Sequence, residues 1–168
     1  RMLYQVTVEK AQTLDDIDTI DLPGLIQQII EEKEPESLKR EVTLSLESQP
    51  ESFSIACNRF LITQSISNLI DNAMAFSNRK DTIKINITTN ETHAIITIRD
   101  HGDGIPAYAL DRIFDRFYSL PRPDTDQKST GLGLSFVKEV AELHGGDVVI
   151  SNHPEGGVEA VLHLRVSQ

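Results

Sequence analysis

Several features are scarce or absent in this sequence, and each absence excludes a class of protein. Cys57 is the only cysteine, so an internal disulfide is impossible and the thiol is expected to be a small buried side chain in a reducing compartment. No apolar run approaches the roughly 20 residues that a membrane-spanning helix needs, and no signal-peptide pattern opens the chain. We therefore expect a soluble polypeptide.

Basic side chains are outnumbered by acidic ones, 16 to 26, which gives a net charge of −10. This charge repels nucleic acid phosphates and anionic lipid surfaces at long range. We therefore expect no nucleic acid partner and no direct membrane contact. A small anionic ligand remains compatible, because backbone N–H groups, a few cations and a metal ion can bind it locally.

The length of 168 residues and the apolar content of 39% indicate one domain with a complete core. We assign residues 15–168 to this domain. Residues 1–14 read instead as the end of an amphipathic helix, because their apolar side chains are spaced in polar surroundings. The chain begins at Arg1 rather than Met, which indicates a piece of a longer protein. The sequence is compatible with a membrane anchor upstream of Arg1.

Hydrophobic periodicity predicts alternating groups of strands and helices. Strands are expected over 17–22, 42–46, 53–55, 83–87, 94–98, 147–151 and 158–166. Helices are expected from Pro23 until near Glu34 and Pro35, where the proline marks the stop, from an Asn58 cap to about Ser77, and from Gly131 to Gly145. The strands over 83–87 and 94–98 are expected to form a hairpin that turns near Asn90.

The second of these helices carries two asparagines, Asn68 and Asn72. They are four residues apart and therefore share one face beside the apolar stripe. An amide oxygen there can ligate a hard cation that phosphate oxygens already surround. Taken alone, each asparagine is better read as an ordinary surface residue, and only the combination with the later glycines favours the ligand reading.

A carboxylate and two glycines follow the predicted strand over 94–98. Asp100 precedes Gly102 and Gly104, where the backbone must turn and a ligand can approach closely. A carboxylate at the mouth of a pocket can accept a hydrogen bond from an exocyclic amine, which distinguishes adenine from guanine. The alternative is a tight loop with a turn-forming aspartate, since this motif by itself is weakly specific.

Gly131 and Gly133 open the last predicted helix, with Ser129 or Thr130 available as a cap. Glycines let a phosphate reach the unpaired N–H groups of the first turn, where the helix dipole favours negative charge. A close packing contact is the alternative reason for glycine. The motif of P-loop nucleotide-binding proteins and the Rossmann fingerprint are both absent, so a nucleotide site here must be of another design.

The preceding residues, 120–130, lack periodicity and contain Arg122 and Lys128. They read as a mobile lid whose two cations meet phosphates. A charged, solvated loop explains the same residues equally well.

The ordered set of motifs resembles the catalytic ATP-binding domain of bacterial sensor histidine kinases. The matching segments are 68–77 (N box), 100–105 (G1 box), 113–118 (F box), 131–134 (G2 box) and 156–157 (last glycine box), and the similarity spans about 22–166. Residues 143–146 and the F box are also similar to a carbon-source-responsive, Cre-type subgroup. The resemblance implies a Bergerat-type α/β fold, an α+β two-layer sandwich in which a mixed, mostly antiparallel sheet is covered by three helices.

The resemblance also implies ATP and Mg²⁺ as cofactors and assigns their contacts. Asn72 would be the Mg²⁺ ligand and Asn68 its neighbour at the phosphates. Asp100 would bind the adenine amine with help from Gly102 and Gly104. The remaining candidate residues would wall the base (Phe76, Ile105, Tyr118, Leu134) or meet the phosphates (Arg122, Lys128, Thr130, Gly131, Leu132, Gly133).

In this family the γ-phosphoryl group passes to a histidine on a separate helical hairpin. That histidine is followed by Glu or Asp and soon by Pro, and none of the five histidines here has this context. We therefore expect a protein-histidine kinase domain that does not phosphorylate itself. His144 lies near a helix end and is expected to interact favourably with the helix dipole.

The implied partners are the chain's own dimerisation and phosphoacceptor hairpin and a response regulator. The fragment is expected to be a monomer and its parent a homodimer. The implied location is the cytoplasmic side of an inner-membrane-anchored bacterial sensor.

Three positions depart from the family pattern. Ala75 replaces a common phosphate-contacting Lys, Ser119 a common Arg, and Val158 a frequent Thr. Charge neutralisation then depends on Arg116, Arg122 or Lys128, so we expect weaker ATP affinity than in strongly cationic relatives.

Two other functions stay open. A related ATPase of the gyrase, Hsp90 or mismatch-repair type usually carries Glu at the first N-box position to activate water, whereas Asn68 is not basic. A degenerate docking module that binds no nucleotide is the second alternative, and titration with Mg-ATP would separate it from the kinase domain.

Overall fold

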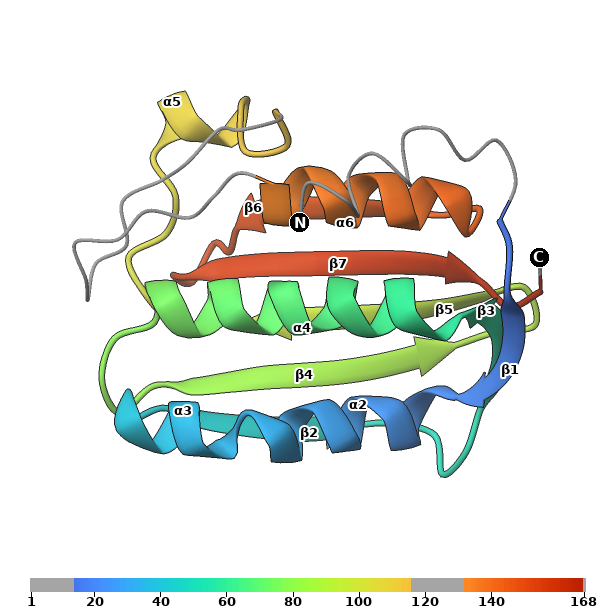
Figure 1. Cartoon of the computed structure of the whole chain (residues 1–168). Helices are drawn as coiled ribbons and strands as arrows, with labels where there is room; N and C mark the ends of the chain where they lie inside the picture. The colour runs from blue at the N-terminus through green and yellow to red at the C-terminus, as the bar shows by residue number, and fades with distance from the viewer. Residues whose placement is uncertain (1–13, 116–131, 168) are drawn as a thin grey trace.

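The computed structural model describes residues 14–115 and 132–167 (Figure 1). Its helices and strands, in chain order, are β1 (Ile17–Asp21), α2 (Leu22–Glu32), α3 (Glu34–Lys39), β2 (Thr43–Ser48), β3 (Ser54–Asn58), α4 (Arg59–Phe76), β4 (Thr82–Thr89), β5 (His93–Arg99), α5 (Ala107–Leu110), α6 (Leu132–Leu143), β6 (Asp147–Asn152) and β7 (Val158–Arg165). None of these helices is long and apolar enough to cross a membrane.

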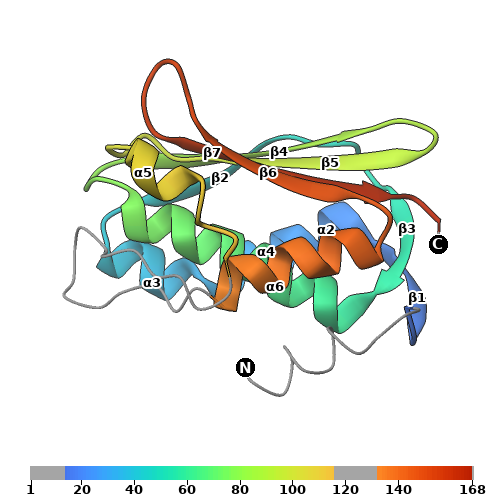
Figure 2. The same cartoon turned by 90° about the horizontal axis from the view of Figure 1, so that it is seen from above.

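The main sheet has five strands in the order β2-β4-β5-β7-β6. β2 pairs with β4 in parallel, and the other neighbours pair antiparallel. β1 and β3 form a separate two-stranded antiparallel sheet. Helices α2, α4 and α6 lie side by side on one face of the main sheet (Figure 2), which confirms the expected two-layer architecture with a mixed, mostly antiparallel sheet.

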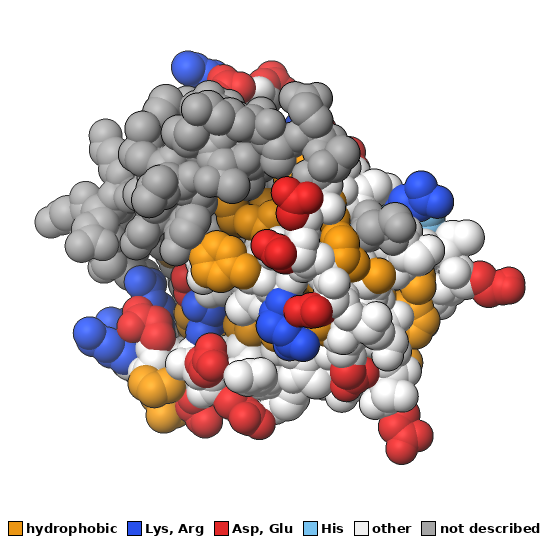
Figure 3. Space-filling view, turned by 45° about the vertical axis from the view of Figure 1, so that its right-hand side comes forward, with side chains coloured by type: hydrophobic (Ala, Val, Ile, Leu, Met, Phe, Trp, Pro, Cys, Tyr) orange, Lys and Arg blue, Asp and Glu red, His pale blue; other side chains and the backbone are white. Residues whose placement is uncertain are grey.

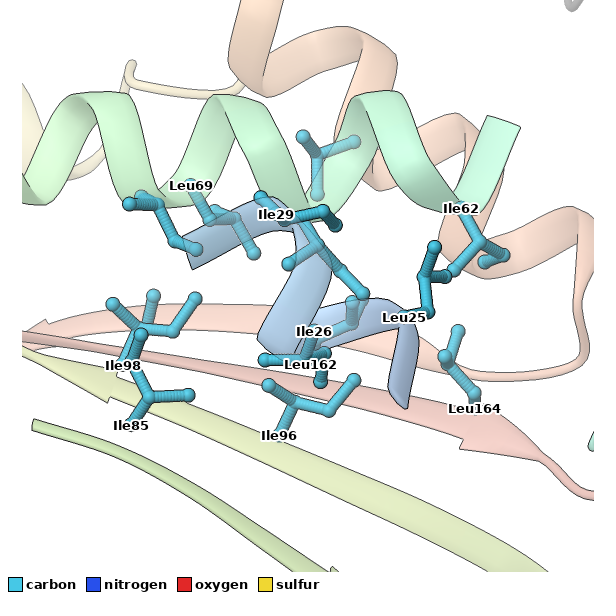
Figure 4. Packing of buried hydrophobic residues seen from close by; sticks show 14 of the residues in the cluster. Leu25, Ile26, Ile29, Ile62, Leu69, Ile85, Ile96, Ile98, Leu162 and Leu164 are labelled. Carbon is cyan, nitrogen blue, oxygen red and sulfur yellow. The ribbon is translucent and has the colours of Figure 1, made fainter. Parts of the chain in front are cut away.

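The core lies between this sheet and the three helices. Every second residue of β4, β5 and β7 points toward the helices, including Ile85, Ile96 and Leu162, and α4 contributes Ile62 and Leu69 (Figure 4). Complete burial of one such side chain stabilises the fold by roughly 1.5–3 kcal/mol. The two-residue period of the strands and the helical stripe of α4 together therefore specify how sheet and helix pack.

The boundaries of α4 agree with the sequence. Asn58 caps the helix, since its Oδ1 accepts a hydrogen bond from the N–H of Leu61 at 2.9 Å, and Nδ2 donates to the Asp15 carbonyl at 3.0 Å. The helix ends at Phe76, and Ser77 is already extended. The hairpin between β4 and β5 is also confirmed, with Asn90 Oδ1 accepting from the N–H groups of Thr92 and His93.

Two helices were not predicted. The first predicted helix stops at Glu32, and α3 begins at Glu34 with Pro35 in its first turn. Proline is tolerated there because the first N–H groups of a helix have no intrahelical partner. Reading Pro35 only as a stop signal was therefore wrong. The short helix α5 follows Pro106 and has too few residues to show a period.

His144 has a different role from the one expected. Its ring is fully buried (0% exposed), and burial lowers its pKa, an effect that the hydrogen bond to the Val140 carbonyl partly offsets. Nδ1 lies 2.8 Å from the Val140 carbonyl, so it carries the proton, and Nε2 accepts from the N–H of Asn58 at 3.0 Å. A neutral imidazole thus joins the end of α6 to the start of α4, and a charged interaction with the helix dipole is not what holds it.

Acidic side chains are dispersed over the face shown in Figure 3 rather than gathered in one patch. The buried thiol of Cys57 agrees with expectation, because it is fully enclosed. Burial raises its pKa to about 11, which leaves the thiol protonated at neutral pH.

Candidate functional site

A pocket lies where α4, α6 and the end of β5 meet. Its walls are Leu69, Asn72, Ala73, Phe76, Ile98, Asp100, Ile105, Leu134, Ile150, Val158 and Ala160. Five of these residues were named as site candidates from the sequence: Asn72, Phe76, Asp100, Ile105 and Leu134. The structure therefore brings the predicted amide, the predicted carboxylate and three predicted apolar walls into one cavity.

Helix α4 supplies one side of the site. Asn72 lines the pocket together with Leu69 and Phe76. Asn68 is not among the lining residues, but its Nδ2 lies 3.8 Å from the position that a Cβ on Gly133 would occupy. The first turn of α6 is thus placed directly against Asn68, as a phosphate site shared by these two helices would need.

Asp100 supplies the charged group. The residue is 2% exposed, and its Oδ1 accepts hydrogen bonds from the N–H groups of Gly102 at 2.9 Å and Val158 at 3.1 Å. Its second oxygen, Oδ2, takes part in neither of these bonds. One oxygen therefore fixes the carboxylate to the backbone while the residue lines an otherwise mostly apolar pocket.

Burial raises the pKa of Asp100 above its ordinary value of 3.8. The two backbone hydrogen bonds lower it again in part, the nearby Asp81 raises it and His101 lowers it. A charge in this position is costly unless a donor satisfies it. The pocket is thus an apolar slot that contains one buried carboxylate in need of a hydrogen-bond donor. An amino group on a flat base can supply that donor.

Close packing fixes the loop that follows Asp100. A Cβ on Gly102 would lie 1.9 Å from the backbone oxygen of Phe76, so only glycine fits between this loop and the end of α4. Gly102 is therefore a site of close approach, but the neighbour is the protein's own backbone rather than the ligand that the sequence suggested. This contact holds Asp100 and Phe76 on adjacent walls of the pocket.

Asp81 holds the start of the same loop. Its Oδ2 accepts from the N–H of His101 at 2.8 Å. The Nδ1 of His101 lies 3.0 Å from Asp81 Oδ1 and 3.0 Å from the Thr82 carbonyl. Both neighbours of Nδ1 are acceptors, so this nitrogen carries the proton. The side chains of Asp81 and His101 therefore anchor the backbone next to Asp100.

Several lining residues were not named from the sequence as part of the site. Ile98, Ile150, Val158 and Ala160 come from β5, β6 and β7. The sequence placed them in predicted strands, but did not indicate that this end of the core is open to a ligand. Asn152 was missed entirely, although it contacts the loop of Asp100 from the end of β6.

The remaining predicted site residues stand as follows. Tyr118, Arg122, Lys128, Thr130 and Gly131 lie outside the described residues, and Leu132 is described only as the first residue of α6. Within 14–115 and 132–167, no group of three or more His, Cys, Asp or Glu side chains could hold a metal ion. A metal bound through the described residues would therefore have at most two such ligands, with amides, water or a bound anion completing its coordination.

Comparison with known proteins gives a consistent result. The family model described as "Histidine kinase-, DNA gyrase B-, and HSP90-like ATPase" matches residues 57–168. Sensor protein CreC of Escherichia coli (strain K12) is 38% identical over 163 residues, which are 97% of this chain and 34% of that protein. The chain thus spans about a third of the length of this relative.

Solved structures share the fold. The catalytic domain of histidine kinase ThkA has a TM-score of 0.80 at 23% identity, and the match covers 91% of this chain and 99% of that chain. Full-length ShkA, solved in complex with AMPPNP, has a TM-score of 0.83 at 20% identity, covering 99% of this chain and 35% of that chain. At these identities the likeness concerns the architecture alone.

Proposed function

We propose a function from one premise: this chain belongs to the family of histidine kinase-, DNA gyrase B-, and HSP90-like ATPases. In our proposal it is the ATP-binding catalytic domain of a two-component sensor histidine kinase. It holds Mg-ATP for phosphoryl transfer to a histidine on a separate helical hairpin. The single observation that carries this proposal is the cavity shared by Asn72 and Asp100.

The pocket fits an adenine ring. Its walls from Phe76, Ile105, Leu134 and Ile150 are apolar, and Asp100 is the acidic side chain in its lining. Transfer of a purine base from water to such apolar walls costs little free energy. Its exocyclic amine would donate a hydrogen bond to the carboxylate, whose charge is otherwise unfavourable in this buried position. Guanine carries a carbonyl oxygen at the same position and would oppose it.

The start of α6 is suited to phosphate. Gly133 has no side chain to block the first turn, and Asn68 lies beside it. The unpaired N–H groups and the helix dipole favour anions at this end. We propose that Thr130, Gly131 and Leu132 extend the same backbone surface and that Arg122 and Lys128 add positive charge.

Asn72 is the proposed protein ligand of Mg²⁺, with phosphate oxygens and water completing the sphere. Bound Mg²⁺ would supply charge neutralisation on the phosphates. The described residues fit this role, because Asn72 lines the cavity and no cluster of three or more carboxylates competes for the ion among them. The chain's own contribution is to orient the nucleotide and exclude water from the base.

The histidine that accepts the phosphoryl group is proposed to lie on the chain's own dimerisation hairpin. A response regulator then receives the group, and the parent protein is proposed to be a homodimer anchored in the inner membrane with this domain in the cytoplasm. Residues 1–14 are proposed to be the end of that hairpin. These proposals rest on the family and on the relative CreC, which this chain covers only in part.

The same family contains ATPases that hydrolyse ATP, but the presence of Asn68 disfavours this activity here. A general base must accept a proton from the attacking water, and a neutral carboxamide does so very poorly. We therefore expect slow ATP hydrolysis by the isolated chain. Fast turnover without a partner would instead favour a hydrolytic ATPase.

Calorimetric titration with Mg-ATP is the direct test. We expect saturable binding by the chain and, after addition of the hairpin from the same parent protein, transfer of the γ-phosphoryl group to its histidine. Absence of binding would reject both the kinase domain and the ATPase, and leave a docking module. Binding without transfer to the hairpin would reject the kinase assignment only.

A further inference from the structure

The loop over 100–106 contains no regular secondary structure, so its backbone polar groups need partners other than those of a helix or a strand ladder. The backbone N–H and C=O of Ile105 are both bound by a single side chain 47 residues away, that of Asn152 at the end of β6. Asn152 Oδ1 accepts from the N–H of Ile105 at 2.7 Å, and Nδ2 donates to the carbonyl of Ile105 at 2.8 Å. The carboxamide thus replaces a neighbouring strand.

Few side chains can make this pair of bonds. A carboxamide presents a donor and an acceptor side by side, whereas a carboxylate at neutral pH only accepts and an ammonium group only donates. The space is also matched to it, because Gly104 adopts a positive φ of 88° and a Cβ there would lie 2.8 Å from Asn152 Oδ1. A side chain at position 104 would push the carboxamide away.

Ile105, the residue that Asn152 holds, belongs to a wall of the candidate site. Ile105 is buried and lines the pocket, and so does Ile150, two residues before Asn152 on the same strand. Asn152 is not among the lining residues, so its influence on a ligand would pass through the residues that it contacts, Ile105 above all. Its two bonds tie the wall formed by Ile105 to β6 and, through the sheet, to β7, which begins at Val158, and to β5, which Asp100 follows.

We propose that Asn152 is a positioning residue for the nucleotide base. It holds Ile105 at the distance from Asp100 and Phe76 at which a flat ring fits between them. This inference rests on the proposed function, since it concerns the same pocket. Loss of the two bonds frees Ile105 and weakens binding of the base without removing any group that touches the ligand.

The test compares Asn152→Ala and Asn152→Asp with the wild type by calorimetric titration with Mg-ATP. Asn152 is exposed, so neither change removes a core side chain. We expect affinity to fall about tenfold in each variant, which corresponds to roughly 1.4 kcal/mol. In Asn152→Asp at neutral pH the carboxylate faces the Ile105 carbonyl without a donor, so similar size alone should not rescue binding.

Asn58→Ala is the matched control. Asn58 also anchors a loop through one donor and one acceptor, to the Asp15 carbonyl and the N–H of Leu61. It lies at the opposite end of α4 from Phe76. We expect this variant to lose stability while its affinity for Mg-ATP, measured where all proteins are folded, stays within twofold of the wild type.

A second readout separates positioning from a general structural defect. Hydrogen exchange should become faster at the Ile105 amide in Asn152→Ala, which removes the acceptor of that N–H, with the amides of α4 unchanged. Unchanged affinity in both Asn152 variants, or an equal loss in Asn58→Ala, would overturn the inference while leaving the proposed function intact. A wild type that does not bind Mg-ATP would overturn the proposed function and this inference with it.

Discussion

Replacement of Asp100 by asparagine tests the chemistry of the pocket most directly. Asparagine keeps an oxygen that can accept the bonds from Gly102 and Val158, which are 2.9 and 3.1 Å long in the wild type. The other oxygen becomes an amino group. Within the proposed site this amino group then faces the exocyclic amine of adenine, so two donors oppose each other where a charged acceptor met a donor.

The expected loss follows from this exchange. A hydrogen bond to a charged group contributes about 1.5–3 kcal/mol, so affinity for Mg-ATP should fall about 10- to 150-fold. Inosine triphosphate carries a carbonyl oxygen in place of the amine and should bind Asp100→Asn better than it binds the wild type. Calorimetric titration with both nucleotides measures the change.

The same substitution should not damage the fold. Because burial raises the pKa of Asp100, the folded state binds a proton more tightly than the unfolded state does. As pH falls from 7 toward 3.8, the ordinary pKa of an Asp carboxyl, the free energy of unfolding of the wild type therefore increases relative to that of Asp100→Asn. At neutral pH, where the wild-type charge is buried, the variant should be equally or more stable.

Denaturation at pH 7 and pH 5 measures this difference, and Asp18→Asn, an exposed position on β1, is the matched control for removal of one carboxylate. Asp18→Asn should change neither nucleotide affinity nor its base preference. The reasoning is refuted if Asp100→Asn binds Mg-ATP within twofold of the wild type, or if it prefers adenosine over inosine triphosphate to the same extent.

Three further predictions concern the described residues. Gly102→Ala should unfold at a clearly lower denaturant concentration and bind Mg-ATP weakly, since its Cβ would lie 1.9 Å from the Phe76 oxygen; wild-type stability would show that the loop shifts freely. Cys57, buried and with its pKa raised to about 11, should react with a thiol reagent at neutral pH only after unfolding, and rapid labelling of folded protein would contradict this. Ser65→Ala should leave stability unchanged or raise it by about 1 kcal/mol, because the buried Ser65 hydroxyl has no hydrogen-bond partner among the described residues; a loss above that size in chemical denaturation would reveal a partner.

The sequence predicted the elements whose signals are local and repeated. The strands β4 and β5 alternate without interruption, and α4 has both a cap and a long apolar stripe, so their positions were correct within a few residues. Helix α3 was not predicted, because Pro35 is compatible both with the end of one helix and with the first turn of the next. Only packing against the neighbouring elements decides between them.

The residues of the site also divide into those with local sequence signals and those that act over long sequence separations. Asn72, Asp100 and Gly102 were visible because each lies in a short motif whose chemistry is complete within a few positions. The groups that hold them in place act over long separations: Asp81 binds a loop 20 residues away, Asn152 one 47 residues away, and the N–H of Val158 bonds to Asp100 across 58 residues. No local period can report such contacts, since they exist only after the sheet has brought the ends of β4, β5, β6 and β7 together. A single sequence therefore indicates candidate ligand-binding groups more readily than the groups that position them, and the structure adds most at these positioning groups.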